Sequence, residues 1–168
     1  MRRFFIIAQL LALFAAGCQC ALAQRIAYGE RTPKIKERHA HWLDGRTPEQ
    51  SDYVFIGFIY SRSNTCREFC FRLDNEMRKM EHPVQVILVT REPADMIDPH
   101  LRDFIDGHTG IISDESGRIF RDFGIRYVPF GVLVDRKRHA LWFGNPLTAD
   151  RDFFKNRASD RKGKKHKR

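Results

Sequence analysis

The chain has 168 residues, of which 42% are hydrophobic, and a formal net charge of +9. This length supports one domain with a single core. The charge is uneven: residues 24–150 hold 19 basic and 19 acidic residues, whereas residues 151–168 hold nine Lys and Arg against two Asp. The basic character therefore belongs to the C-terminal end, which excludes a basic nucleic-acid-binding domain in the body of the chain.

Residues 1–23 have the organisation of a secretory signal peptide. Two arginines precede an apolar core that is too short to span a bilayer, and Ala-Leu-Ala at 21–23 is a small-residue cleavage site. A lipoprotein-type sequence leaves a second route open, in which Cys18 is lipid-modified and tethers the protein. Both routes predict export to the periplasm or another extracytoplasmic compartment, where disulfides can form.

Cleavage after residue 23 removes Cys18 and Cys20 and leaves Cys66 and Cys70 as the only cysteines. Two cysteines exclude a disulfide scaffold, so any intramolecular bridge must join this pair.

The strongest pattern in the chain lies at 53–80. An aromatic and β-branched run at 53–60 predicts a buried strand, and a short polar loop follows at 61–65. Apolar residues then recur at helical spacing and form one stripe: Cys66, Phe69, Cys70, Leu73, Met77 and Met80. The strand therefore leads into a helix with a cysteine in its first turn, and helix N-termini favour the thiolate form of cysteine.

The other segments predict an alternation of strands and helices. A polar lead-in at 24–51 has its one strong apolar and turn signal at 42–45. Asp98 and Pro99 are an N-cap and a first helical residue, and Thr148 caps a last helix through Phe153 and Phe154. After the helix that begins near residue 66, we expect strands at 84–90, 110–114, 131–135 and 139–143, and helices at 98–107 and 116–123.

Residues 157–168 contain a single apolar residue and are expected to form a disordered, solvated tail. Such a tail can make weak contact with an acidic membrane surface, and we expect no specific nucleic-acid partner.

Three motifs, in this order, resemble the thioredoxin superfamily. The run Ser63-Asn64-Thr65-Cys66-Arg67 falls on the family's C-x-x-C site, with Ser63 in place of the attacking cysteine. The segment Gly-Ile-Arg-Tyr-Val-Pro resembles the family's run that ends in a cis-proline facing the thiol site, here Pro129. The ending Trp-Phe-Gly-Asn-Pro at 142–146 resembles that of TlpA-like redoxins.

The resemblance covers residues 40–155. It implies an α/β, thioredoxin-like fold, with a central mixed sheet flanked by helices, at 52–156. It also implies that Ser63 lies at the start of the helix, where its hydroxyl can accept a backbone N–H, and that Cys66 lies one turn in and is less exposed.

Serine without a general base is a poor nucleophile and forms no disulfide, which counts against ordinary C-x-x-C exchange. Cys66 and Cys70 are the candidate redox thiols, as attacker and resolver. Residues four apart on a regular helix hold their Cβ atoms about 5–6 Å apart. In a disulfide the two Cβ atoms are about 3.5–4.5 Å apart, so the helix would have to distort around Cys66 to form a Cys66–Cys70 bridge. The alternative role for Cys70 is a core residue.

Three functions follow from these patterns. The first is an extracytoplasmic thiol–disulfide protein of the TlpA-like redoxin group with weakened or altered activity. The second is a redox-inactive module that holds a client or partner chain in the groove beside Ser63 and Pro129. Neither requires a cofactor. The third is a Sco-type copper protein, since two thiolates and an imidazole suit Cu(I), but the histidine that this family places near 128–130 is missing here.

Overall fold

The computed structural model describes residues 26–77 and 83–148. Its elements, with 3₁₀ helices written η, follow the order η1 (Glu37–His39), β1 (His41–Trp42), η2 (Leu43–Gly45), β2 (Tyr53–Ile59), α2 (Asn64–Met77), β3 (Gln85–Thr90), η3 (Pro99–Phe104), β4 (Thr109–Ser113), α3 (Arg118–Phe123), β5 (Phe130–Asp135), β6 (Ala140–Gly144) and η4 (Pro146–Thr148). Every strand and helix predicted within the described residues is therefore present, with ends that differ by a few residues.

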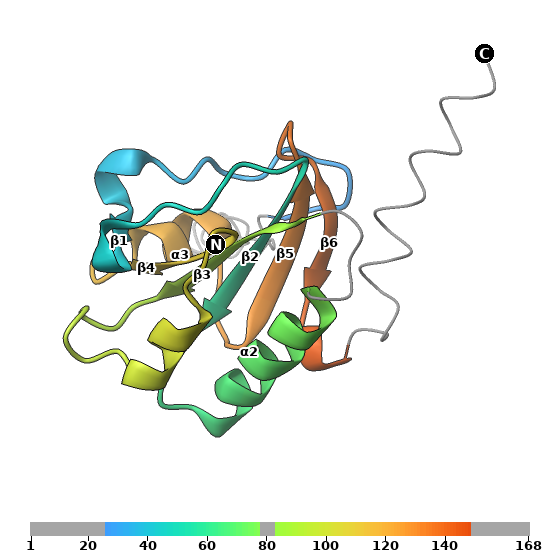
Figure 1. Cartoon of the computed structure of the whole chain (residues 1–168). Helices are drawn as coiled ribbons and strands as arrows, with labels where there is room; N and C mark the ends of the chain where they lie inside the picture. The colour runs from blue at the N-terminus through green and yellow to red at the C-terminus, as the bar shows by residue number, and fades with distance from the viewer. Residues whose placement is uncertain (1–25, 78–82, 149–168) are drawn as a thin grey trace, which may run out of the picture.

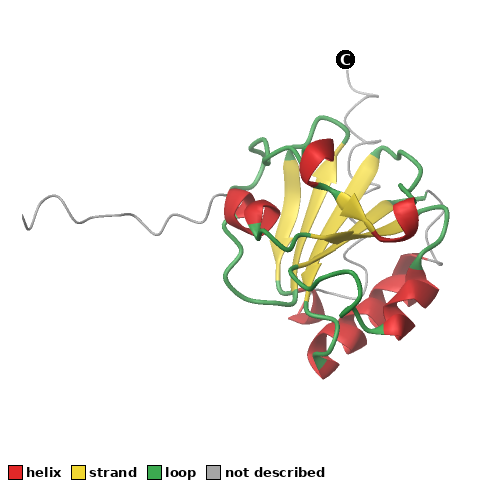
Figure 2. Cartoon of the chain, turned by 90° about the vertical axis from the view of Figure 1, so that its left-hand side faces the viewer, coloured by secondary structure: helices red, strands yellow, loops and turns green. Residues whose placement is uncertain are grey.

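The strands form one six-stranded sheet in the order β1-β4-β3-β2-β5-β6 (Figure 1). β2, β3 and β4 are parallel to one another, whereas β1, β5 and β6 each run antiparallel to their neighbours. Helices lie on both faces of the sheet, as the turned view makes clear (Figure 2). This confirms the predicted α/β architecture, a central mixed sheet flanked by helices.

The lead-in contributes to both edges of this sheet. β1 pairs with β4 at one edge, through His41 with Ser113 and Trp42 with Ile112. At the other edge the Gly29 amide donates to the Ala140 carbonyl over 2.7 Å, beside β6. The turn signal at 42–45 thus marks β1 and η2.

The helix ends follow local capping chemistry. The Asp98 carboxylate accepts the His100 amide at 3.0 Å and caps η3, as its sequence predicts. The N-cap residue of α3 is Gly117, and the first-turn amides of Arg118 and Phe120 donate to the Asp114 carboxylate at 2.9 and 3.0 Å. Gly124 ends α3 with a φ of 69°, a conformation that glycine adopts readily.

Several sequence-based expectations lie outside the described residues: the signal peptide at 1–23, Met80 of the apolar stripe, the helix through Phe153 and Phe154, and the tail at 157–168. Within residues 26–77 and 83–148, no helix has the length and hydrophobicity needed to cross a bilayer.

The sheet separates two cores. On one face the stripe of α2 packs on alternate residues of β2 and on β3, including Phe55, Ile59 and Leu88. On the other face α3 packs on the intervening residues, so that Phe58 lies between Phe120 and Phe123 at ring distances of 5.0 and 5.3 Å. The period-two alternation of β2 therefore serves both helical layers.

A pair of glycines sets how closely α2 approaches the sheet. Gly57 of β2 and Gly131 of β5 are register partners on the α2 face. A Cβ at Gly57 would come within 2.9 Å of Leu88 and 3.2 Å of Phe69, and one at Gly131 within 2.5 Å of Phe55. Because Phe55 and Phe69 are buried, they have little room to move aside.

We therefore expect Gly131→Ala to lower the free energy of unfolding by about 1–3 kcal/mol through overpacking. Gly107→Ala is the matched control, because a Cβ there would meet only a Glu49 side-chain oxygen at 3.8 Å. Its stability should stay within about 1 kcal/mol of the natural protein. Urea denaturation measures both, and equal stability of the two variants would show that the glycine pair does not limit the packing.

Candidate functional site

The candidate site lies where the chain leaves β2. β2, β3 and β4 are parallel, so their carboxyl ends meet at one edge of the sheet. Phe130 pairs with Phe58 near the end of β2, and this register brings the preceding Val128–Pro129 segment to the same edge. Pro129 is buried and its peptide bond is cis, as the resemblance implied.

Ser63 caps the N-terminus of α2. Its Oγ accepts the Cys66 amide at 3.4 Å, and its carbonyl accepts the Arg67 amide at 2.9 Å. The Ser63 amide in turn donates to the Tyr60 carbonyl at 3.1 Å, which closes the turn between β2 and α2. A hydroxyl in this position satisfies an amide that the helix itself leaves unpaired. The geometry is that expected of a serine at the helix start.

Cys66 lies three residues into the helix and is only 1% exposed. Its Sγ accepts the Tyr60 backbone amide at 3.4 Å, so the sulfur points back toward the end of β2. Substrate disulfides in solution cannot reach a sulfur in this position without a local opening of the chain.

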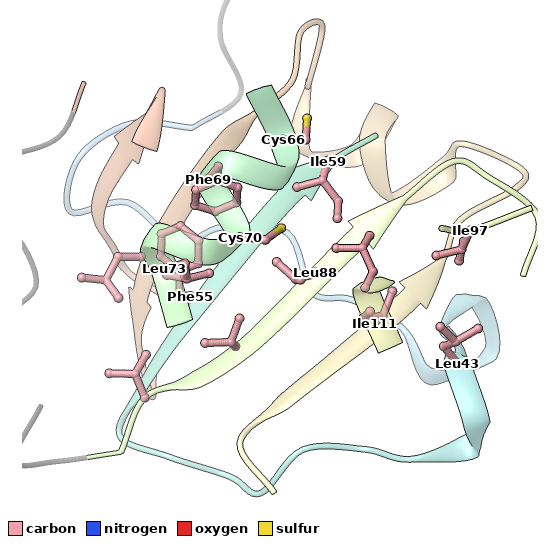
Figure 3. Close-up of a cluster of buried hydrophobic side chains, with 14 residues drawn as sticks. Leu43, Phe55, Ile59, Cys66, Phe69, Cys70, Leu73, Leu88, Ile97 and Ile111 are labelled. Atoms are coloured by element: carbon pink, nitrogen blue, oxygen red, sulfur yellow. The ribbon is translucent and has the colours of Figure 1, made fainter. Parts of the chain in front are cut away.

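Cys70 lies one turn further along α2 and points toward the sheet, where Leu88 lies (Figure 3). It is 2% exposed, and burial, reinforced by the neighbouring Cys66, raises its pKa from the ordinary value of 9.0 to about 12. Cys66 and Cys70, the cysteines of the described residues, are both free thiols. Cys70 therefore stays protonated at physiological pH, as expected of a core cysteine.

A buried carboxylate holds the loop before α2. Glu92, 7% exposed, accepts the Ser61 amide at 2.6 Å, the Ser61 hydroxyl at 2.7 Å and the Thr90 hydroxyl at 2.7 Å. The Ser61 hydroxyl also accepts the Asp98 amide at 2.9 Å. This network joins the carboxyl ends of β2 and β3 to the loop that enters η3.

The role of Glu92 does not emerge from the sequence. An acidic residue just after a buried strand was the available signal, but its partner Ser61 lies 31 residues earlier and only the fold brings them together.

Exposed apolar side chains lie on the chain segments that adjoin the 61–63 loop and the cis-proline. Tyr60, Met96 and Tyr127 are 47%, 46% and 57% exposed, and the Tyr127 ring lies edge-on to Phe130 at 5.4 Å. Next to them is an open groove of about 460 Å³, lined by Arg62, Arg67, Asp95, Met96, Ile97, Asp98 and Pro99. These exposed side chains and the residues that line the groove together offer apolar contacts and hydrogen-bonding groups.

The Sco-type hypothesis requires an imidazole ligand beside the two thiolates. Across residues 26–77 and 83–148, no group of three or more His, Cys, Asp or Glu side chains is arranged to hold a metal ion. The residues present therefore do not support the Sco-type hypothesis.

The four site residues predicted from the sequence thus lie in one region of the fold but differ in burial and position. Ser63 and Pro129 lie at the carboxyl edge of the sheet, whereas Cys66 and Cys70 are withdrawn beneath it into the core.

No protein-family model and no curated protein sequence matches this chain. Solved structures are similar to it. A thioredoxin-like protein from Aeropyrum pernix has a TM-score of 0.56 at 16% identity, over 72% of this chain and 89% of its own. The reduced 2-Cys peroxiredoxin of Plasmodium vivax has a TM-score of 0.59 at 15% identity, over 83% and 99%.

A secreted disulfide oxidoreductase from Mycobacterium tuberculosis has a TM-score of 0.54 at 16% identity, over 71% of this chain and 92% of its own. Identities this low establish a shared fold and not a shared activity. The mixed sheet, the two helical layers and these structural matches together identify the chain as an α/β protein with the thioredoxin-like fold.

Proposed function

We propose that the protein is an extracytoplasmic, thioredoxin-like protein of the TlpA-like redoxin group that holds a segment of a client or partner chain beside Pro129. In this proposal it carries out little or no disulfide exchange in its natural form. It would share the fold and the client-binding surface of thiol–disulfide proteins without their exchange activity.

One observation carries this proposal: a serine hydroxyl occupies the start of α2, while both sulfurs are buried. Disulfide exchange needs an accessible thiolate, because the attacking sulfur must approach the client disulfide along the S–S axis. Ser63 has no sulfur to offer. Cys66 is covered by the 60–63 turn and Cys70 is held in its thiol form by burial.

Three exposed apolar side chains support the proposal that the protein binds another chain. Tyr60, Met96 and Tyr127, on the segments that adjoin the 61–63 loop and the cis-proline, leave large apolar surfaces in water, and such surfaces commonly mark contact sites for another chain. Tyrosine is favoured in such surfaces because its ring is apolar and its hydroxyl stays hydrogen-bonded. A protein chain is therefore a better-matched ligand than a small polar molecule.

Weak exchange through Cys66 and Cys70 is a second function, favoured by their position on successive turns of α2. After local opening, the Cys66 thiolate would attack a client disulfide, forming a mixed disulfide and releasing one client thiolate. The Cys70 thiolate would then attack the Cys66 sulfur, releasing the second client thiolate and leaving a Cys66–Cys70 disulfide. The helix would have to distort around Cys66 for this bridge to form.

Insulin reduction by dithiothreitol separates these functions. We expect the natural protein to show weak or no catalysis. Ser63→Cys should raise activity at least about tenfold, because it restores a C-x-x-C pair whose first sulfur lies at the helix N-terminus. The matched control is Ser63→Cys combined with Cys66→Ser, which should lose the gain because the resolving thiol is missing.

Strong catalysis by the natural protein that disappears in Cys66→Ser would instead support a working Cys66–Cys70 pair. An unchanged rate in a folded Ser63→Cys variant would mean that Ser63 is only a capping residue and that the proposed position of the site is wrong.

The pKa of Cys70 predicts a pH dependence of stability. An unfolded thiol loses its proton near pH 9, whereas the folded one keeps it until about pH 12. The folded state therefore binds more protons in this window, and its stability falls as pH rises from about 9 toward 12, by up to about 1.4 kcal/mol per pH unit. In Cys70→Ala this contribution should vanish, so that the two urea-denaturation profiles converge above pH 9. Parallel profiles would show that Cys70 ionises normally in the folded state.

Export is tested by the mass of the mature chain. We expect protein recovered from an exporting host to begin at Gln24, because the small residues before it suit signal peptidase. Intact mass spectrometry measures this directly. A mass that includes a diacylated Cys18 would contradict cleavage after residue 23 and establish a membrane tether.

A further inference from the structure

A second cluster of polar side chains lies between η1 and α3, and none of its residues lines the groove formed by Arg62, Arg67 and residues 95–99. The guanidinium groups of Arg38 and Arg118 converge there on one atom, the Nε2 of His39. The Arg38 Nε is 3.1 Å and the Arg118 Nη1 is 2.9 Å from that nitrogen. Both arginines are exposed and His39 is half-buried, so the cluster opens to solvent.

The chemistry of the three groups defines the state of His39. A guanidinium can only donate hydrogen bonds, so Nε2 must accept and the ring must be neutral, with its proton on Nδ1. One lone pair is then shared by two charged donors. The remaining N–H groups of both arginines have no carboxylate within 4 Å in the described part of the chain.

Among the described side chains, the charges that act on His39 are mostly positive. Partial desolvation lowers the pKa of His39, and the positive charges of Arg118, Arg38 and Lys36 lower it further, while Asp122 acts in the other direction. The Arg91 guanidinium lies over Gly117, the residue before Arg118, where a Cβ would come within 2.9 Å of its Nε. Arg91 makes no hydrogen bond or ion pair within the described residues.

These observations have a common explanation. Two guanidinium groups brought together around one weak, neutral acceptor repel each other, and an acceptor with several charged oxygens would satisfy them better. Arginine is the side chain best suited to such oxygens, because its planar donors match the spacing of two oxygen atoms. The cluster also follows the carboxyl ends of β3 and β4, the edge of parallel strands at which ligands usually bind.

We propose that Arg38, His39 and Arg118 form a binding site for a phosphate group. The two arginines donate to the phosphate oxygens, and His39 takes up a proton on Nε2 and donates as well. A phosphate group fits better than a single carboxylate because its charge of about −1.5 to −2 and three terminal oxygens match three donors. Its source is either a free phosphate compound or the terminal phosphate monoester of an anionic lipid such as phosphatidic acid.

The test follows the His39 ring by NMR in the full chain as recovered from an exporting host, with the signal assigned by its loss in His39→Gln. One arm compares sodium phosphate with sodium chloride at equal ionic strength. The other compares phosphatidylcholine vesicles that contain phosphatidic acid, a lipid with a terminal phosphate monoester, with vesicles of phosphatidylcholine alone. We expect a saturable change and an upward shift of the His39 titration midpoint, because a bound anion favours the protonated ring.

Arg118→Gln should weaken this response at least about tenfold, since it removes one charge-assisted hydrogen bond. Arg121→Gln is the matched control, because it removes the same charge from α3 at a residue whose Nη1 donates to the Ser116 carbonyl and not to His39. Its response should stay within about twofold of the natural protein.

A response to free phosphate alone, or to anionic vesicles alone, supports the site and identifies the source of the phosphate group. A His39 signal unchanged by both overturns the proposal. Equal weakening by Arg118→Gln and Arg121→Gln also overturns it, because general charge attraction would then explain the effect.

Discussion

The buried carboxylate of Glu92 fixes the geometry on which the site depends. It binds the amide and hydroxyl of Ser61, and through that hydroxyl it holds the Asp98 amide, so that three chain segments meet at one point. A buried carboxylate is costly unless its oxygens accept several hydrogen bonds, and here they accept three. The turn at 60–63 is thereby fixed in place, and α2 begins where Ser63 can cap it.

The two glycines beneath α2 determine how deeply the thiols of this helix are buried. Gly57 and Gly131 leave room for Phe55 and Phe69 to pack between helix and sheet, with ring centroids 5.9 Å apart. A helix seated this closely buries four residues of its apolar stripe in the core: Cys66, Phe69, Cys70 and Leu73. Cys66 and Cys70 belong to that stripe, so the packing that stabilises α2 is also what removes both sulfurs from solvent.

The carboxyl edge of the sheet then presents two chemically different surfaces. Around Pro129 the surface is apolar at its rim, with tyrosine and methionine side chains in water, and Arg67 lies 3.5 Å from the Asp98 carboxylate. Around His39 the arginines have no such partner in the described residues. One surface therefore suits a protein chain and the other an anion, and the two can be altered independently because they share no side chain.

The sequence alone determined the order of strands and helices from β2 onward, since these have strong local causes such as the apolar runs at 53–60 and 84–90, the stripe of α2 and the cap at Asp98. It did not predict β1 in the polar lead-in. It also determined, through the resemblance, that Pro129 would be cis and that Ser63 would start the helix. The tertiary structure alone decided that Cys66 is covered by the 60–63 turn, that Glu92 meets Ser61, and that His39 meets Arg118, 79 residues away. Capping and periodicity act within a few residues and can be recognised along the chain, whereas burial and charge clustering depend on segments that only the folded sheet brings together.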